Sequence, residues 1–285
     1  QLFVITFGYG SPIASALDII FPLFVAYFIF VAHYAAQRYR LTRTVWRGLR
    51  GGMTGSAWNY GAYAFAVSVL SGFTFTLAWP WARSRLIERR LGNSYFGDAK
   101  VTVAFSARPL YPSYLAGFAA FLAGVGALAY AGYAAPSGTA FFDRLQELFS
   151  MGGPTKKGGS SDEDMAEFVF LVIGIYFAAI LLVVLWSSVC FAWFNAATAR
   201  AVAGNATFQA LRFSSSASGG GVAWLPPSNL LLMLLTFYLA YPVVVQRTIR
   251  FVVRHMHIHG TLDVEALRQT TLPKKRTGEG LLEVF

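Results

Sequence analysis

Five long apolar stretches, each set off by clustered Lys and Arg, constrain this chain more than any other feature of its sequence. The stretches lie at about 16–35, 57–82, 113–134, 167–194 and 226–246. Each has about 20 residues or more, which as a helix rising 1.5 Å per residue crosses a hydrocarbon core of about 30 Å. Because lipid offers a backbone no hydrogen-bonding partners, such stretches are expected to be helical. The sequence predicts an all-α membrane protein with about five transmembrane or re-entrant helices.

The composition excludes a water-soluble domain. Hydrophobic residues make up 56% of the 285 residues and charged residues only 13%, with a mean hydropathy of +0.51, whereas soluble domains are about 25% charged. The single cysteine, Cys190, excludes a disulfide scaffold. The net charge of +10 comes from residues that flank the apolar stretches. Membrane topology and contact with anionic lipids explain that charge, so nucleic-acid binding is not expected.

Two topologies fit the distribution of basic residues. In the first, all five stretches span the membrane in simple alternation. In the second, 57–82 and 226–246 are re-entrant or broken helices that return to the side they left, with Pro80 and Pro242 among their breakers. The second places more Lys and Arg in the cytoplasm and is slightly favoured by the positive-inside rule. Both place the C-terminus in the cytoplasm, and the first stretch, which runs straight into Arg38, is expected to be a retained anchor.

Two parts of the sequence resemble each other. LAWP at 77–80 and LAYP at 239–242 each follow a Thr-containing apolar stretch, and each precedes a run of arginines at helical spacing. Comparable Gly-centred elements around Gly48 and Gly204 come before them, and we expect short hairpin-like cytoplasmic segments there. The pattern predicts an internal repeat. Such repeats flank the central site of many transporters, but duplication is also a common way for a membrane protein to grow.

The repeat suggests four regions along the chain. They are a first membrane repeat at 1–134, a non-cytoplasmic amphipathic helix and flexible loop at 135–166, a second membrane repeat at 167–263 and a cytoplasmic tail at 264–285. The arginines after each proline are expected to lie on interfacial helices and to touch anionic headgroups. These residues are Arg83, Arg85, Arg89, Arg90, Arg247, Arg250 and Arg254.

Three segments carry a family likeness. They are RYRLTRTVWRGLRGGMTGS at 38–56, LAWPWARSRLIERR at 77–90 and YFGD at 95–98. In these segments the chain resembles the YjgN-like inner-membrane proteins of bacteria, over most of its length from about 38 to 268. The resemblance implies a multi-pass protein of the bacterial inner membrane with a repeat architecture. Because that family has no assigned function, the resemblance brings no catalytic or binding residue with it.

Candidate chemistry is sparse. His255, His257 and His259 are the one dense group of metal-capable side chains, and three imidazoles can hold zinc or copper. No neighbouring carboxylate or cysteine completes a ligand shell, so a solvated cluster at the membrane edge is the favoured interpretation and a metal is not expected. The sequence contains no HExxH, GxSxG or Walker-type motif. We therefore expect neither an enzyme nor a bound cofactor.

The loop at 135–166 is the best candidate for docking a partner. Its apolar residues follow helical spacing, and they are Phe141, Phe142, Leu145, Leu148 and Phe149. With few ionisable groups at membrane depth, the sequence favours a non-catalytic accessory, assembly or regulatory subunit that contacts lipid and other membrane proteins. A transporter or channel for a small molecule or lipid, built on the repeat interface, is the alternative.

Overall fold

The computed structural model describes residues 12–134, 162–261 and 268. The chain divides into two compact units, each made of separate stretches of sequence. The first unit holds residues 1–109, 200–215 and 256–285, and the second holds 110–199 and 216–255. The units interleave along the chain, and the four consecutive regions suggested by the sequence stay a prediction. Helices dominate both units, but the first also contains two small sheets, so the prediction of an all-α protein is corrected.

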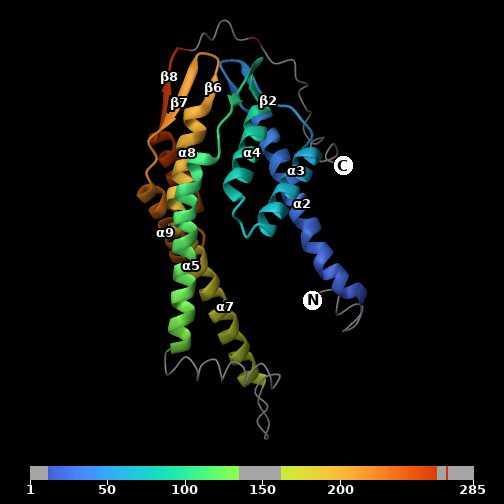
Figure 1. Ribbon diagram of the computed structural model, residues 1–285, viewed down its shortest axis with the longest axis vertical. Helices are drawn as coiled ribbons and strands as arrows, with labels where there is room; N and C mark the ends of the chain where they lie inside the picture. Colours follow the sequence, from blue (N-terminus) through green and yellow to red (C-terminus); the bar gives the residue numbers. More distant parts are fainter. Residues whose placement is uncertain (1–11, 135–161, 262–267, 269–285) are drawn as a thin grey trace. The chain divides into compact units, whose positions relative to one another are not determined.

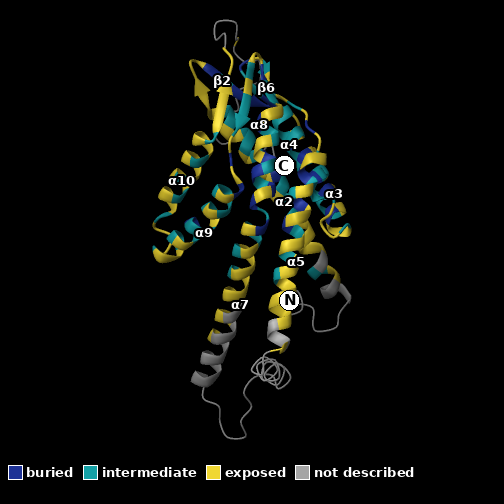
Figure 2. Cartoon of the chain, turned by 60° about the vertical axis from the view of Figure 1, so that its left-hand side comes forward, coloured by how far each residue is buried: buried dark blue, intermediate teal, exposed yellow. Residues whose placement is uncertain are grey.

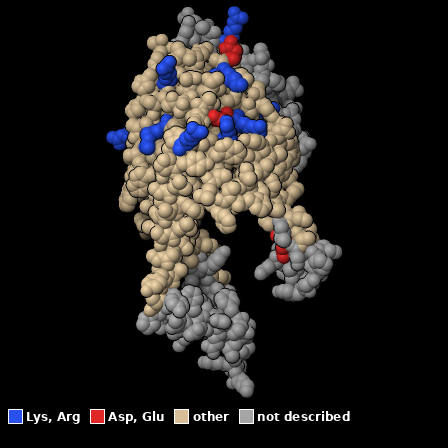
Figure 3. All heavy atoms as spheres, in the orientation of Figure 1, with Lys and Arg blue, Asp and Glu red and all other residues tan. Residues whose placement is uncertain are grey.

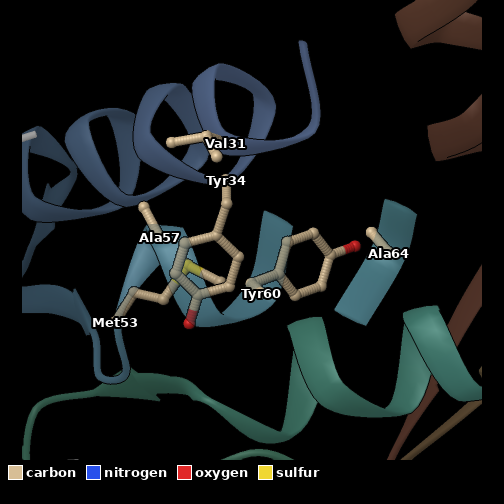
Figure 4. Packing of buried hydrophobic residues seen from close by; sticks show 6 residues of the cluster. All are labelled: Val31, Tyr34, Met53, Ala57, Tyr60 and Ala64. Carbon is tan, nitrogen blue, oxygen red and sulfur yellow. The ribbon is translucent and has the colours of Figure 1, made fainter. Parts of the chain in front are cut away.

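Three helices form the base of the first unit: α2 (Pro12–Arg43), α3 (Ala57–Phe73) and α4 (Trp79–Gly92). Where α2 crosses α3, their side chains and one strand residue form the main core, made of Val31, Tyr34, Met53, Ala57, Tyr60 and Ala64 (Figure 4). The rings of Tyr34 and Tyr60 stack with centroids 4.6 Å apart. Gly61 allows this approach, because a Cβ at that position would collide with the side chain of Val31.

Two four-stranded antiparallel sheets complete the first unit (Figure 1). The first contains β1 (Val45–Trp46), β2 (Leu49–Met53), β3 (Ser94–Phe96) and β4 (Ala99–Lys100). The second contains β5 (Thr102–Val103), β6 (Ala206–Phe208), β7 (Leu211–Ser215) and β8 (Met256–His259). Leu49 and Phe208 are buried together between them. The rings of Phe96 and Phe208 also meet there, edge to face at 6.3 Å.

A two-residue turn lies at Gly48, where the sequence predicted a short hairpin-like segment. Arg47 and Gly48 have φ angles of 49° and 79°, the pair of positive values that a type I′ turn between antiparallel strands requires. The turn fixes the register Trp46↔Leu49. The segment around Gly48 is therefore a β-hairpin at the edge of a sheet, which the prediction of an all-α protein did not include.

The second unit is entirely helical in the residues described. A short 3₁₀ turn, η1 (Arg108–Leu110), leads to α5 (Tyr111–Ala134), and α7 (Asp162–Cys190), α8 (Ala192–Asn205), α9 (Gly219–Leu235) and α10 (Tyr241–Arg254) follow. Gly117 meets the backbone carbonyl of Cys190, and Gly124 meets the ring of Trp186. Small residues thus bring α5 and α7 close together, as in the helix pairs of membrane proteins.

Five spans are not shown within the part of the chain that the structure describes. There, two helices are long and apolar enough to cross a membrane, at Ala16–Arg43 and Arg108–Tyr130. The pair Phe177–Cys190 and Ala192–Asn205, bent by 49°, makes a third if it is one span. Much of α5 and α7 is exposed (Figure 2). The stretches 57–82 and 226–246 do not form single helices: a turn divides each of them.

Candidate functional site

The two divided stretches have the same local structure at a constant spacing of 162 residues. Helices α3 and α9 both have 17 residues, and α4 and α10 both have 14. Ser56 caps α3 by accepting the N–H of Asn59 at 3.4 Å, and Ser218 caps α9 by accepting the N–H of Gly221 at 3.2 Å. We call α3–α4 and α9–α10 the first and second helical hairpins.

The turn of each hairpin uses an unusual backbone. In the first, Phe75 and Thr76 have φ angles of 49° and 65°, and in the second Phe237 and Tyr238 have 47° and 68°. This left-handed region normally favours glycine. Each turn then leads into a proline within the first two positions of the next helix, where its missing N–H and fixed φ suit the helix start.

Every backbone N–H in the two turns has an acceptor inside its own hairpin. In the first turn the N–H groups of residues 74 to 79 donate to Leu70 O, Gly72 O, Ser71 O, Thr74 O, Thr74 Oγ1 and Thr76 O. In the second turn those of residues 236 to 241 donate to Leu232 O, Leu234 O, Met233 O, Thr236 O, Thr236 Oγ1 and Tyr238 O. Proline, which has no N–H, follows in both cases. The backbone N–H groups of these turns therefore need no water molecule as an acceptor.

The turns also carry large apolar side chains that the protein leaves uncovered. Phe75 is 82% exposed and Phe237 is 89% exposed, and Phe73 and Leu239 are similarly uncovered. No charged residue occurs in 57–82 or in 219–246. The two turns therefore form exposed apolar tips, which we call the hairpin tips.

The open ends of the hairpins are tied in the same way. The N–H of Thr54, just before α3, donates to the carbonyl of Asn93, just after α4, at 2.9 Å. In the second hairpin the N–H of Ser216 donates to the carbonyl of His255, also at 2.9 Å. Each hairpin is thus closed at its base by a backbone hydrogen bond.

The predicted headgroup arginines differ between the hairpins. Arg85 and Arg247 occupy matching positions on α4 and α10, but Arg83, Arg89 and Arg90 correspond to Val245, Phe251 and Val252. In the second hairpin Arg247 donates to Ser228 Oγ at 3.1 Å, and Arg250 and Arg254 are exposed. The first hairpin therefore carries a basic cluster that the second lacks.

The basic cluster is built around Arg90. Its Nη1 lies 2.8 Å from Nε2 of His33 on α2. Its Nε is buried without a hydrogen-bond partner. Burial, and next the charge of Arg90, lower the pKa of the Arg83 guanidinium. Lys and Arg outnumber Asp and Glu on the face drawn in Figure 3.

The neighbouring charges on α4 have other partners. Glu88 accepts from Arg85 through Oε2 and from the N–H of Phe105 through Oε1, both at 3.0 Å. The guanidinium of Arg89 lies 3.6 Å from the centre of the Tyr63 ring, a cation–π contact.

Two of the three predicted histidines, His255 and His259, have different hydrogen-bonding partners. His255 ends α10, and its Nδ1 lies 2.8 Å from the carbonyl oxygen of Phe251. His259, on β8, lies with Nε2 2.9 Å from Ser214 Oγ. Among the residues described, no three His, Cys, Asp or Glu side chains form a group that could hold a metal ion.

The predicted docking residues of the 135–166 loop cannot be placed. They are Phe141, Phe142, Leu145, Leu148 and Phe149, and they lie outside the described residues.

Sequence reasoning overlooked His33, Tyr34 and Asn93. The Tyr34 hydroxyl donates to the carbonyl of Thr54 and accepts from Asn93 Nδ2, the latter at 3.1 Å. This side chain joins α2 to both ends of the first hairpin. One signal was available: His33 is an ionisable residue at the end of an apolar stretch, where such residues are functional by default.

Comparison with known proteins gives one match. A family model described as a bacterial protein of unknown function (DUF898) matches residues 1–284. No curated protein and no solved structure matches the chain.

Proposed function

The chain belongs to the DUF898 family of bacterial proteins, and we propose that it is a multi-pass inner-membrane protein whose two helical hairpins re-enter the bilayer. We further propose that it acts without catalysis, as an accessory, assembly or regulatory subunit of a membrane complex. The narrower YjgN-like name, drawn from the sequence, stays a prediction.

The exposed apolar side chains of the hairpin tips are the main support for re-entry. In water, exposing a phenylalanine instead of burying it costs about 1.5–3 kcal/mol, and each tip exposes at least two large apolar side chains. In lipid those side chains are at their most stable. Non-helical backbone is normally excluded from lipid because its polar groups lack partners. The turn N–H groups all have acceptors within the hairpin, which removes the main penalty on the donor side.

The shared spacing supports an internal repeat. The serine caps, turn conformations, proline positions and basal hydrogen bonds all recur 162 residues apart. Independent origins would have to reproduce all four features in the same order. We infer that one helical hairpin with its preceding strands was duplicated.

Exposed apolar helices support the subunit role. Large residues such as Leu128, Phe177 and Leu182 lie uncovered along α5 and α7. Lipid covers such faces, and so do neighbouring membrane proteins, which pack against small and apolar residues. The proposed role needs no reactive group.

Cysteine labelling tests the topology. In a Cys190→Ala background, Gly92→Cys lies at the last residue of the first hairpin and Asn205→Cys at the last residue of α8. Re-entry places both in the cytoplasm and Ser160→Cys outside, whereas simple alternation gives the reverse. We expect a membrane-impermeant maleimide to label only Ser160→Cys in intact spheroplasts. Labelling of the other two without permeabilisation would contradict re-entry.

Purification from native membranes tests the subunit role. We expect a second polypeptide to remain in constant ratio through two chromatographic steps in mild detergent. A mass equal to one or more copies of this chain alone, obtained directly from native-membrane nanodiscs, would contradict it.

A further inference from the structure

We propose that the outer edge of strand β8 is a docking site for an extended segment of another protein, in which acidic residues alternate with apolar ones. The site deepens the proposed subunit role, and it rests on that role only for the existence of a partner protein.

The backbone of β8 turns part of its hydrogen-bonding groups outward. β8 is the last strand of its sheet, next to β7. The N–H of Ser216 donates to the carbonyl of His255 at 2.9 Å, one step before the pair of Ser215 with Met256. Residues that bond to the neighbouring strand alternate with residues that do not in an antiparallel ladder. The N–H and C=O groups of Met256 and Ile258 therefore point away from β7.

The equivalent edge of the first sheet is occupied. Ser94 lies 162 residues before Met256, at the same place on strand β3. The N–H of Val101 donates to the carbonyl of Ser94 at 3.0 Å, and Ala99 pairs with Phe96. This side of the strand therefore accepts an added strand in the first sheet.

The chain does not fold back onto β8 at Gly260. A Cβ at Gly260 would collide with the carbonyl oxygen of Ala210, in the turn between β6 and β7, so the chain continues along β7 where it leaves β8. In the first sheet, by contrast, Gly97 and Asp98 turn the chain back from β3 to β4. Within the described residues, no strand covers the outer edge of β8.

The two faces of β8 define the side chains that suit an added strand. Met256 and Ile258 point to one face and are 44% and 60% exposed. His257 and His259 point to the other face, where Arg212 of β7 lies directly opposite His259. An added strand buries apolar side chains on the first face and places its alternate side chains beside the basic group.

Charge favours acidic residues at those alternate positions. Strands β6, β7 and β8 contain Arg212, His257 and His259 but no Asp or Glu. Opposite charges across two strands stabilise their pairing, and like charges destabilise it. An open edge strand pairs readily with another chain, with affinity from main-chain hydrogen bonds and specificity from alternate side chains. The chemistry that fits is an extended segment of alternating acidic and apolar residues.

Peptide binding to the full-length protein in detergent tests the proposal. One probe is a seven-residue peptide that alternates valine and glutamate, with both ends blocked, and the other has lysine in place of glutamate. We expect the glutamate peptide to bind about tenfold or more tightly. Its binding should slow hydrogen exchange about tenfold or more at the amides of Met256 and Ile258. The amide of His257, which points toward β7, should not change.

A proline on the open side of β8 tests the backbone contact. Ile258→Pro removes an outward donor and leaves the hydrogen bonds to β7, because proline is tolerated on the open side of an edge strand. It should weaken binding of the glutamate peptide about tenfold. Ile258→Val is the matched control, because it keeps the N–H and the branched shape, and it should stay within about twofold. If Ile258→Pro fails to fold, the exchange measurement on the unaltered protein decides.

Equal binding of the two peptides, or undiminished binding by Ile258→Pro, would overturn the site. Protection of the Met256 and Ile258 amides without peptide would also overturn it. Protection at every protein concentration would assign the edge to another segment of the same chain, and protection that grows with concentration would assign it to a second copy. A copurified partner without peptide binding would keep the subunit role and reject this edge. Peptide binding without a copurified partner would do the reverse, so the site and the proposed function fail separately.

Discussion

Thr74 and Thr236 perform the same task in the two helical hairpins. The Thr74 hydroxyl donates to the carbonyl of Leu70 or Ser71 and accepts the N–H of Ala78. The Thr236 hydroxyl donates to the carbonyl of Leu232 and accepts the N–H of Ala240. The acceptor distances are 3.2 Å at Ala78 and 3.1 Å at Ala240. One side chain thus ends a helix and supplies the acceptor that the turn would otherwise lack.

Replacing either threonine by valine should destabilise its hairpin. Thr74→Val keeps the shape but leaves the N–H of Ala78 without an acceptor, which costs about 1–3 kcal/mol. Thr236→Val should cost a similar amount. Chemical denaturation in detergent micelles measures the loss. Thr74→Ser retains the hydroxyl, and a loss equal to that of valine would contradict the role of the hydrogen bond.

Two glycines on α3 should respond to alanine in opposite directions. At Gly61 the added methyl group collides with Val31, so Gly61→Ala should destabilise the protein by about 1–3 kcal/mol through overpacking. Gly72 has open space around it, so Gly72→Ala should stabilise the helix by about 0.5–1 kcal/mol. The melting temperatures of the two variants in one detergent give the comparison. If both substitutions changed the melting temperature in the same direction, the packing of α2 on α3 at Gly61 would be refuted.

Removing the Tyr34 hydroxyl should loosen the base of the first hairpin. Tyr34→Phe leaves the Thr54 carbonyl and Asn93 Nδ2 without their shared partner, at a cost of about 1–3 kcal/mol. Tyr60→Phe preserves the ring stack and should change stability by less than about 0.5 kcal/mol. Hydrogen exchange should report faster opening at Thr54 in the first variant. Equal protection in both variants would show that the hydroxyl does not matter.

The tips should enter lipid. An environment-sensitive dye attached at Phe75→Cys or Phe237→Cys, with Cys190 replaced by alanine, should fluoresce at shorter wavelength in vesicles and be quenched by lipid-borne quenchers. Lys100→Cys, at the exposed residue of strand β4, serves as the control and should respond to aqueous iodide instead. Iodide quenching at both tips, as strong as at position 100, would place them in water.

The helices were the predictable part of the fold. The stretch 113–134 coincides closely with α5, and 167–194 is covered by α7 and the start of α8, because a long apolar run in lipid has little choice but helix. Pro80 and Pro242 lie in the first turns of α4 and α10, just after the breaks, where a missing N–H does no harm. Pro226 and Pro227, which were also expected to break the helix, lie inside α9, so proline alone does not locate a break.

The sheets and the basic cluster escaped prediction for physical reasons. The strands have two to five residues, too few for an alternating pattern to register. Their pairings also join distant segments, such as Gly51 with Phe96 and Thr102 with Thr207. The contact of His33 with Arg90 depends on the crossing of α2 with the hairpin, which no spacing within either segment encodes.

The left-handed residues at the tips carry a cost of their own. A residue other than glycine in this conformation gives up about 1–2 kcal/mol, and both turns place a bulky aromatic there. Glycine would adopt this conformation without strain, but it has no apolar side chain to insert into lipid. Selection for thermal stability alone should therefore recover glycine at positions 75 and 237. The resulting protein should be more stable to heat, but its turns should insert less strongly into a bilayer.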